Sequence, residues 1–158
     1  MQADPLLSPH FHLSEFTHSQ TAERFGIANV PGAAQVQNLY ALARVLEQVR
    51  TVLGVPLLLS SGFRSPELNR IVGGAQEPPS AHLDGRAADF TAPGFGPPLV
   101  VCRCLAASGI AFDHLIFEGT WVHLGIAKTG ATPRRMVMTA RFQTPGRASY
   151  SPGLPVSP

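Results

Sequence analysis

Residues 80–92 read SAHLDGRAADFTA, and this stretch decides the fold because a loop passes into a strand within it. The residues before it, GGAQEPP at 73–79, are rich in glycine and proline and predict a loop, whereas RAADFTA at 86–92 has the pattern of a strand. His82 therefore lies in the loop and Asp89 in the strand. Their separation is not the i, i+4 spacing of a helical His-Glu-x-x-His site, so the two side chains must come from a loop followed by a strand.

Upstream, the sequence predicts a helix followed by a strand. Apolar residues recur three and four positions apart over residues 33–53, which is the spacing of an amphipathic helix, and Gly54 ends it. VPLLLS at 55–60 is consistent with a buried strand, and the turn sequence SGFRSP after it places Arg64 at the end of that strand. Residues 10–31 are expected to form a short helix and a wrapping loop.

Downstream, a helix is expected over 98–108, followed by two strands, FDHLIFE at 112–118 and WVHLGI at 121–126. Gly119 and Thr120 separate these strands and predict a β-hairpin. The fold class is therefore α+β. We expect a small antiparallel-rich sheet, built from strands near residues 55, 86, 112 and 121, with the two long helices packed against it.

The chain of 158 residues has the length of one ordinary domain. We expect that domain over residues 1–127. Residues 128–158 are expected to add one edge strand, at RRMVMTARF, and a flexible tail rich in proline and glycine. Cys102 and Cys104 fall in the expected second helix, where they point in different directions, so we expect buried thiols without a disulfide.

Composition restricts the partners of the chain. Hydrophobic residues make up 44% and charged residues 14% of the sequence, which is enough apolar surface for a folded core. The net charge of +2 does not demand a nucleic-acid partner. The sequence shows neither a signal peptide nor an apolar run that could span a membrane, so we expect synthesis in the cytoplasm without membrane insertion. We also expect the protein to be a monomer.

A third metal-ligand candidate lies in WVH at 121–123. Val122 and Leu124 point to one side of that strand and leave His123 and Trp121 on the other. Two imidazoles and one carboxylate, from His82, Asp89 and His123, are a ligand set that a catalytic zinc ion uses while it keeps one position open for water. The same ligand types also occur in some iron sites.

These motifs resemble the zinc D-alanyl-D-alanine carboxypeptidase superfamily, which includes L-alanyl-D-glutamate endopeptidases of phages. The resemblance covers roughly residues 10–127 and is closest to the short phage and prophage branch; it rests on SGFRSP, VGGAQEPPSAH, DGRAAD, FDHLIFE and WVH. It implies that His82, Asp89 and His123 bind one zinc ion. It also implies that Arg64 holds a substrate carboxylate or carbonyl oxygen, a task that suits its planar, permanently charged fork, and that Ser80 supports the site.

The sequence departs from the family at the general base, which usually lies three residues before the last histidine, where this chain has Thr120. A two-residue turn at Gly119 and Thr120 places Glu118 opposite Trp121 and diagonally from His123, at roughly 7 to 8 Å between backbones. We therefore expect Glu118 to be the base. His114, which shares the face of the metal ligands, and Asp113 are the lesser candidates.

The resemblance implies a zinc metallopeptidase that hydrolyses peptidoglycan stem peptides or cross-bridges. We expect Glu118 and Arg64 to be the catalytic residues and Arg64, Ser80 and Trp121 to lie against the substrate. Such an enzyme would reach the cell wall by release or delivery after its synthesis. Trp121 could instead be a packing residue. Because the usual base is displaced, an alternative is a cell-wall-binding or virion module that keeps the fold without turnover. A purely structural zinc ion is a third possibility, and it predicts unfolding on chelation.

Overall fold

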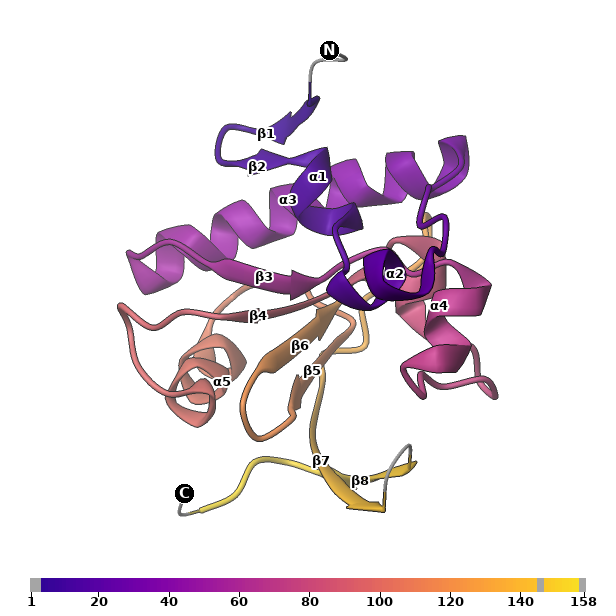
Figure 1. Cartoon of the computed structure of the whole chain (residues 1–158). Helices are drawn as coiled ribbons and strands as arrows, with labels where there is room; N and C mark the ends of the chain where they lie inside the picture. Colours follow the sequence, from indigo (N-terminus) through magenta and orange to yellow (C-terminus); the bar gives the residue numbers. More distant parts are fainter. Residues whose placement is uncertain (1–3, 145–146, 157–158) are drawn as a thin grey trace.

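The computed structural model describes residues 4–144 and 147–156, in which helices pack against one main β-sheet (Figure 1). Two short strands and two short helices precede the long helix α3. The elements are β1 (Leu6–Ser8), β2 (Phe11–His12), α1 (Leu13–Thr17), α2 (Gln20–Phe25), α3 (Ala33–Leu53), β3 (Leu58–Ser61), α4 (Pro66–Ile71), the 3-10 helix η1 (Ala81–Asp84), β4 (Ala87–Thr91), α5 (Pro98–Ala107), β5 (His114–Phe117), β6 (Val122–Gly125), β7 (Met136–Thr144) and β8 (Arg147–Pro152).

The main sheet has the strand order β3-β4-β6-β5-β7-β8. Each neighbouring pair is antiparallel except β5 and β7, which run parallel. The four strands expected from the sequence are therefore present, and β5 and β6 form the expected hairpin. The α+β class with a small, mostly antiparallel sheet is confirmed.

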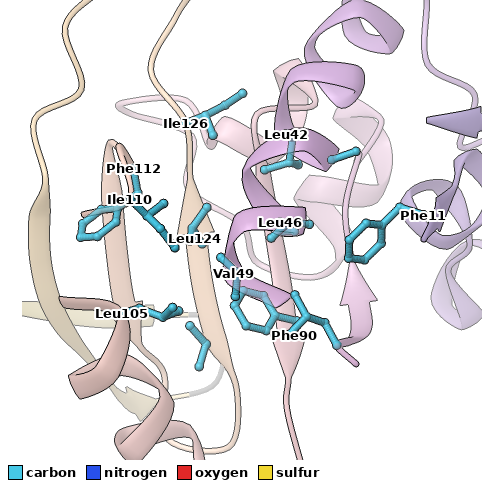
Figure 2. Close-up of a cluster of buried hydrophobic side chains, with 14 of the residues drawn as sticks. Phe11, Leu42, Leu46, Val49, Phe90, Leu105, Ile110, Phe112, Leu124 and Ile126 are labelled. Carbon is cyan, nitrogen blue, oxygen red and sulfur yellow. The ribbon is translucent and has the colours of Figure 1, made fainter. Parts of the chain in front are cut away.

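The core lies between α3 and the sheet, as Figure 2 shows for Leu42, Leu46 and Val49. These three side chains are fully buried, and they belong to one apolar cluster with Phe90 of β4 and Leu124 of β6. Gly54 ends α3 with φ +68°, and its N–H donates to the carbonyl of Arg50. A left-handed glycine at this position satisfies a carbonyl that the helix would otherwise leave free. The helix expected over 33–53 is thus confirmed.

Residues after 128 differ from the expectation of one edge strand and a flexible tail. β7 lies inside the sheet, with β5 on one side and β8 on the other, so β8 is the edge strand. Beyond β8, Leu154 packs against the core, and the carbonyls of Pro155 and Val156 accept hydrogen bonds from Arg103 at 2.8 Å each. The sequence RASYSP did not predict this strand because it has few apolar residues. Backbone hydrogen bonds to β7 hold the strand in the sheet.

The N-terminal segment also contains a feature that the sequence did not predict. β1 and β2 form a small antiparallel hairpin above α3, in addition to the expected helical turns (Figure 1). Cys102 is buried and Cys104 half-buried, both as free thiols. Among residues 4–144 and 147–156, no helix is long and apolar enough to cross a membrane.

Candidate metal centre

His82, Asp89 and His123 converge at one buried point, where their ligand atoms lie within 4.8 Å of one another. His123 Nδ1 is 2.8 Å and His82 Nε2 is 3.3 Å from Asp89 Oδ1. The two ring nitrogens are 3.2 Å apart. The three residues are 2 to 7% exposed. The structure therefore brings together the three residues that the sequence selected as metal ligands.

The sheet register positions two of these side chains. Asp89 on β4 is paired directly with His123 on β6, and His123 is paired with Ile116 on β5. Paired residues project from the same face of a sheet, so the carboxylate and the imidazole meet without any unusual backbone geometry. The pairing of Ile116 with His123 agrees with the two-residue turn, which places Glu118 opposite Trp121.

The third side chain comes from the loop that precedes β4. His82 lies in η1, which Ser80 begins by accepting a hydrogen bond from the His82 N–H at 3.3 Å. Gly85 ends η1 with φ +69°, and a side chain there would crowd the carbonyl of Gln35. The glycine therefore supplies both the left-handed turn and the space against α3 that the chain needs to enter β4.

The proton positions of His82 follow from one contact. Its Nδ1–H donates to the carbonyl of Gly62 at 2.6 Å, because a carbonyl oxygen can only accept. In the neutral ring, the Nε2 lone pair then faces Asp89 and His123. A hydrogen bond of this kind to the far ring nitrogen is the usual way in which proteins orient a metal-binding histidine.

Arg64 contacts the other oxygen of the Asp89 carboxylate, Oδ2. Its Nη2 donates to Asp89 Oδ2 at 2.8 Å, and its Nε donates to Ser61 Oγ at 3.0 Å. Burial raises the pKa of Asp89, but His82 and His123 outweigh this effect and hold that pKa well below its usual range. Asp89 is therefore an anion whose Oδ1 faces the two imidazoles.

Glu118 occupies the hairpin position expected of it. Its N–H donates to the carbonyl of Trp121 at 3.1 Å, and Gly119 has φ +79° in the turn. Burial raises the pKa of Glu118; the Asp89 charge raises it further, whereas His123, Trp121 and Arg64 lower it. The carboxylate thus lies close enough to the cluster to be affected by its charges.

The remaining candidates lie nearby in other arrangements. Trp121 packs against Phe142 with ring centroids 5.8 Å apart, and its buried indole N–H has no hydrogen-bond partner within the described part of the chain. The Ser80 hydroxyl caps η1 and so supports His82. Asp113 does not contact the cluster, since Arg134 holds both of its carboxylate oxygens, at 3.0 and 2.7 Å.

Two functional candidates were missed from the sequence, and both lie on the strands beyond β5. Ala140 on β7 follows Thr139, which is paired with Phe117, and Tyr150 on β8 is paired with Ala140. Tyr150 therefore projects from the same face as Glu118, with β7 between the two strands. Burial raises the pKa of the Tyr150 hydroxyl, and the charges of Glu118 and Asp89 raise it further. Phe142 is the second candidate, through its contact with Trp121.

The donor set fits a zinc ion. Three electron-pair donors, His82 Nε2, Asp89 Oδ1 and His123 Nδ1, converge in a buried place where their lone pairs repel unless a cation or protons lie between them. Ligand atoms bound tetrahedrally to zinc are about 3.3 to 3.6 Å apart, given bonds of about 2.0 to 2.2 Å. Two of the three separations found here, 3.2 and 3.3 Å, are near that range, and the third, 2.8 Å, is shorter.

An α+β fold whose sheet presents two imidazoles and a carboxylate in this way belongs to the class of proteins that could hold a single metal ion, with the ligand set used by zinc hydrolases. Residues 9–125 match the family model described as peptidase M15. The match covers most of the chain, and the protein belongs to the peptidase M15 family, whose members are zinc peptidases. No curated protein matches the chain.

Proposed function

We propose that this protein is a zinc-dependent peptidase that hydrolyses amide bonds in the stem peptides or cross-bridges of peptidoglycan. Membership of the peptidase M15 family supports the peptidase activity. The single observation that carries the proposal is the convergence of His82, Asp89 and His123 within 4.8 Å, beside a carboxylate, Glu118, that has no arginine or lysine bonded to it among the described residues.

In this proposal His82 Nε2, Asp89 Oδ1 and His123 Nδ1 hold one zinc ion. When bound, such an ion acidifies water to a pKa of about 7 and polarises a carbonyl group. Gly62 and Arg64 fix two of the ligands in place through the contacts with His82 Nδ1 and Asp89 Oδ2. These contacts hold the ligand set in one geometry before the ion binds.

Glu118 is the general base in the proposal. Its carboxylate takes a proton from the attacking water and returns it to the leaving amine, which a carboxylate with a raised pKa does better than one with an ordinary pKa. Trp121 is near enough to this carboxylate to lower its pKa, and in the proposal it lines the site. His114 is not the base, because its Nε2 is already bonded to His123.

Arg64 retains guanidinium N–H groups beyond those used on Asp89 and Ser61. We assign these to a carboxylate or the developing oxyanion of the substrate, since arginine can bond such groups in pairs. Ser80 acts indirectly, through the turn that carries His82. In the proposal, the substrate contacts a wall of three aromatic residues next to Glu118. They are Trp121 directly before β6, Phe142 on β7 and Tyr150 on β8.

The domain boundary and the place of action are also proposals. The family match ends at residue 125, which supports a peptidase domain over residues 1–127. Within that proposal the β7–β8 hairpin is an addition that extends the face of the site. The cell-wall substrate requires release or delivery of the protein after synthesis in the cytoplasm.

Release of free amino groups from purified peptidoglycan tests the proposal. The zinc-loaded protein should release them, whereas the chelated protein, His123→Ala and Glu118→Gln should not. Glu118→Gln is the matched variant because it keeps the size of the side chain and removes its charge. Stoichiometric zinc binding with no release would favour a binding module that retains the fold.

A further inference from the structure

His123 contacts a second histidine on the side away from the metal centre. His114 on β5 places its Nε2 2.8 Å from His123 Nε2. The two rings are nearly parallel, with an interplanar angle of 14° and centroids 4.9 Å apart. His123 therefore directs Nδ1 to Asp89 and Nε2 to His114, and both of its ring nitrogens have a defined neighbour.

The outer neighbour of His114 fixes the direction of this contact. His114 Nδ1 lies 3.4 Å from Asp113 Oδ2, which can only accept, so Nδ1 carries a proton and the Nε2 of the neutral ring is an acceptor. Two ring nitrogens at 2.8 Å need one proton between them. That proton belongs to His123 Nε2, and the lone pair of His123 Nδ1 is then directed at the centre.

Asp113 is itself held by a surface residue. Arg134 donates to Asp113 Oδ1 from Nε at 3.0 Å and from its backbone N–H at 3.1 Å, and to Oδ2 from Nη2 at 2.7 Å. The Asp113 side chain is 9% exposed and that of Arg134 61%. A chain of polar contacts thus runs from the surface through Arg134, Asp113 and His114 to His123.

The fold reserves space for this arrangement at Gly125. Gly125 on β6 is paired with His114 on β5, and the imidazole occupies the space in which a side chain of residue 125 would begin. A Cβ atom at residue 125 would overlap the ring atoms of His114. Only glycine lets the ring take this position, although Gly125 itself lies in an ordinary strand and needs no positive φ.

We propose that His114 is a positioning residue, which accepts the Nε2–H of His123 and so presents His123 Nδ1 as a metal ligand. The proposal rests on the proposed zinc site. It also gives Asp113 and Arg134 an indirect positioning role, because they keep the His114 ring in the orientation in which its Nε2 accepts the His123 N–H. His114 belongs to the support of the ligand set and touches neither substrate nor metal.

Zinc affinity, measured by competition with a chromophoric chelator, tests this role in His114→Leu and His114→Gln. The leucine variant should bind zinc about 10- to 100-fold more weakly, which is the usual effect of removing such a partner. The glutamine variant should recover most of the affinity, since its amide oxygen can accept the same N–H. His18→Leu is the matched control, because it removes an exposed histidine that lies 3.3 Å from Glu23 and not at the centre.

A second readout follows the hydrogen bond itself. In nitrogen-15 NMR spectra of the zinc-loaded wild-type protein, the Nε2–H of His123 should exchange slowly with water, and it should exchange fast in His114→Leu. Thermal unfolding of the metal-free variants shows whether they are folded. A folded His114→Leu with wild-type affinity, or an equal loss in the leucine and glutamine variants, would overturn the proposal.

The outcomes separate this inference from the proposed function. Zinc binding that depends on His114, without any hydrolysis of peptidoglycan, counts against the peptidase and leaves the positioning role intact. Hydrolysis of peptidoglycan by a protein whose zinc affinity does not change when His114 is replaced supports the peptidase and overturns the positioning role. Failure of the wild-type protein to bind zinc overturns both.

Discussion

Asp89 Oδ1 and His123 Nδ1 lie 2.8 Å apart because their residues are directly paired across β4 and β6. The pair needs no loop to bring it together, so it is as rigid as the centre of the sheet. Only His82 reaches the centre from a loop, and its Nδ1 contact with Gly62 ties that loop to the segment after β3. Two proposed ligands on paired strands and one on a tethered turn make a candidate site that is preorganised by the fold.

This preorganisation predicts the effect of removing the metal. The chelated protein should keep its fold and unfold cooperatively, because the core between α3 and the sheet does not depend on the ion. Zinc at 100 times its dissociation constant should stabilise the protein by about 2.7 kcal/mol. Thermal unfolding with zinc and with chelator measures the difference. Loss of the far-ultraviolet circular dichroism spectrum on chelation would instead indicate a structural zinc ion.

Leu46 offers a test of the core that leaves the site untouched. Its side chain is fully buried on α3 and faces the cluster that includes Phe90 and Leu124 (Figure 2). Leu46→Ala should destabilise the protein by about 2 to 5 kcal/mol through lost burial and the cavity left behind. Urea unfolding measures the change. Val52→Ala, on an exposed part of the same helix, is the control and should change stability by much less.

The proposed metal ligands could be predicted from the sequence in part from local patterns. The loop before RAADFT places His82, and strand alternation places His123 and Trp121 on one face, whereas the meeting of Asp89 with His123 depends on the pairing of β4 with β6. The two-residue turn at Gly119 likewise fixed Glu118 opposite Trp121. The turn and the alternation need only neighbouring residues, whereas the choice of the three ligands also rested on the resemblance of their motifs to the zinc peptidases.

Other features depend on pairings that no local pattern specifies. β7 joins β5 in parallel after a long connection, and β8 pairs with β7 although its residues are mostly polar and exposed. Tyr150 therefore reaches the face of Glu118 from a distant part of the chain. The support of His123 by His114 was missed for another reason, since the sequence put His114 on the correct face but could not show which neighbour its ring meets.

Asp113 predicts a specific dependence of stability on pH. The hydrogen bonds from Arg134, against some opposition from burial, lower the pKa of Asp113 well below its ordinary value of 3.8. A carboxylate whose pKa is depressed in the folded state contributes stability above its unfolded pKa, and this contribution is lost as the pH falls through the folded pKa. Asp113→Asn should therefore cost about 2 kcal/mol at pH 7.

The difference between Asp113→Asn and the wild-type protein should narrow as the pH falls below about 4, because the Asp113 carboxyl of the unfolded chain then becomes protonated while that of the folded protein stays charged until its lower pKa is reached. Urea unfolding of both proteins at several pH values measures it. Asp84→Asn is a suitable control, since Asp84 also pairs with an arginine, Arg86, but its side chain is 50% exposed. A gap between Asp113→Asn and wild type that stays constant down to pH 2 would contradict the assigned role of the charge.

Tyr150 should contribute to substrate binding more than to turnover. It projects from the face of Glu118, across the small and buried Ala140, and its own side chain is about half exposed and free to meet a ligand. Tyr150→Ala should raise KM several-fold and leave kcat within about two- to threefold, as expected when an interaction is equally strong in the ground and transition states. Ser151→Ala, the next residue on the opposite face of β8, should change neither value.

Substrate binding without turnover can be followed through the fluorescence of Trp121, which lies beside Phe142. Trp121 is the only tryptophan of the chain and packs 5.8 Å from Phe142, so its fluorescence reports directly on this surface. In the Glu118→Gln background, soluble peptidoglycan fragments should shift the emission of Trp121, and Tyr150→Ala should weaken the binding curve by the factor found for KM. A binding curve that Tyr150→Ala leaves unchanged would show that Tyr150 does not contact the substrate, and the proposed contact would then involve only Trp121 and Phe142.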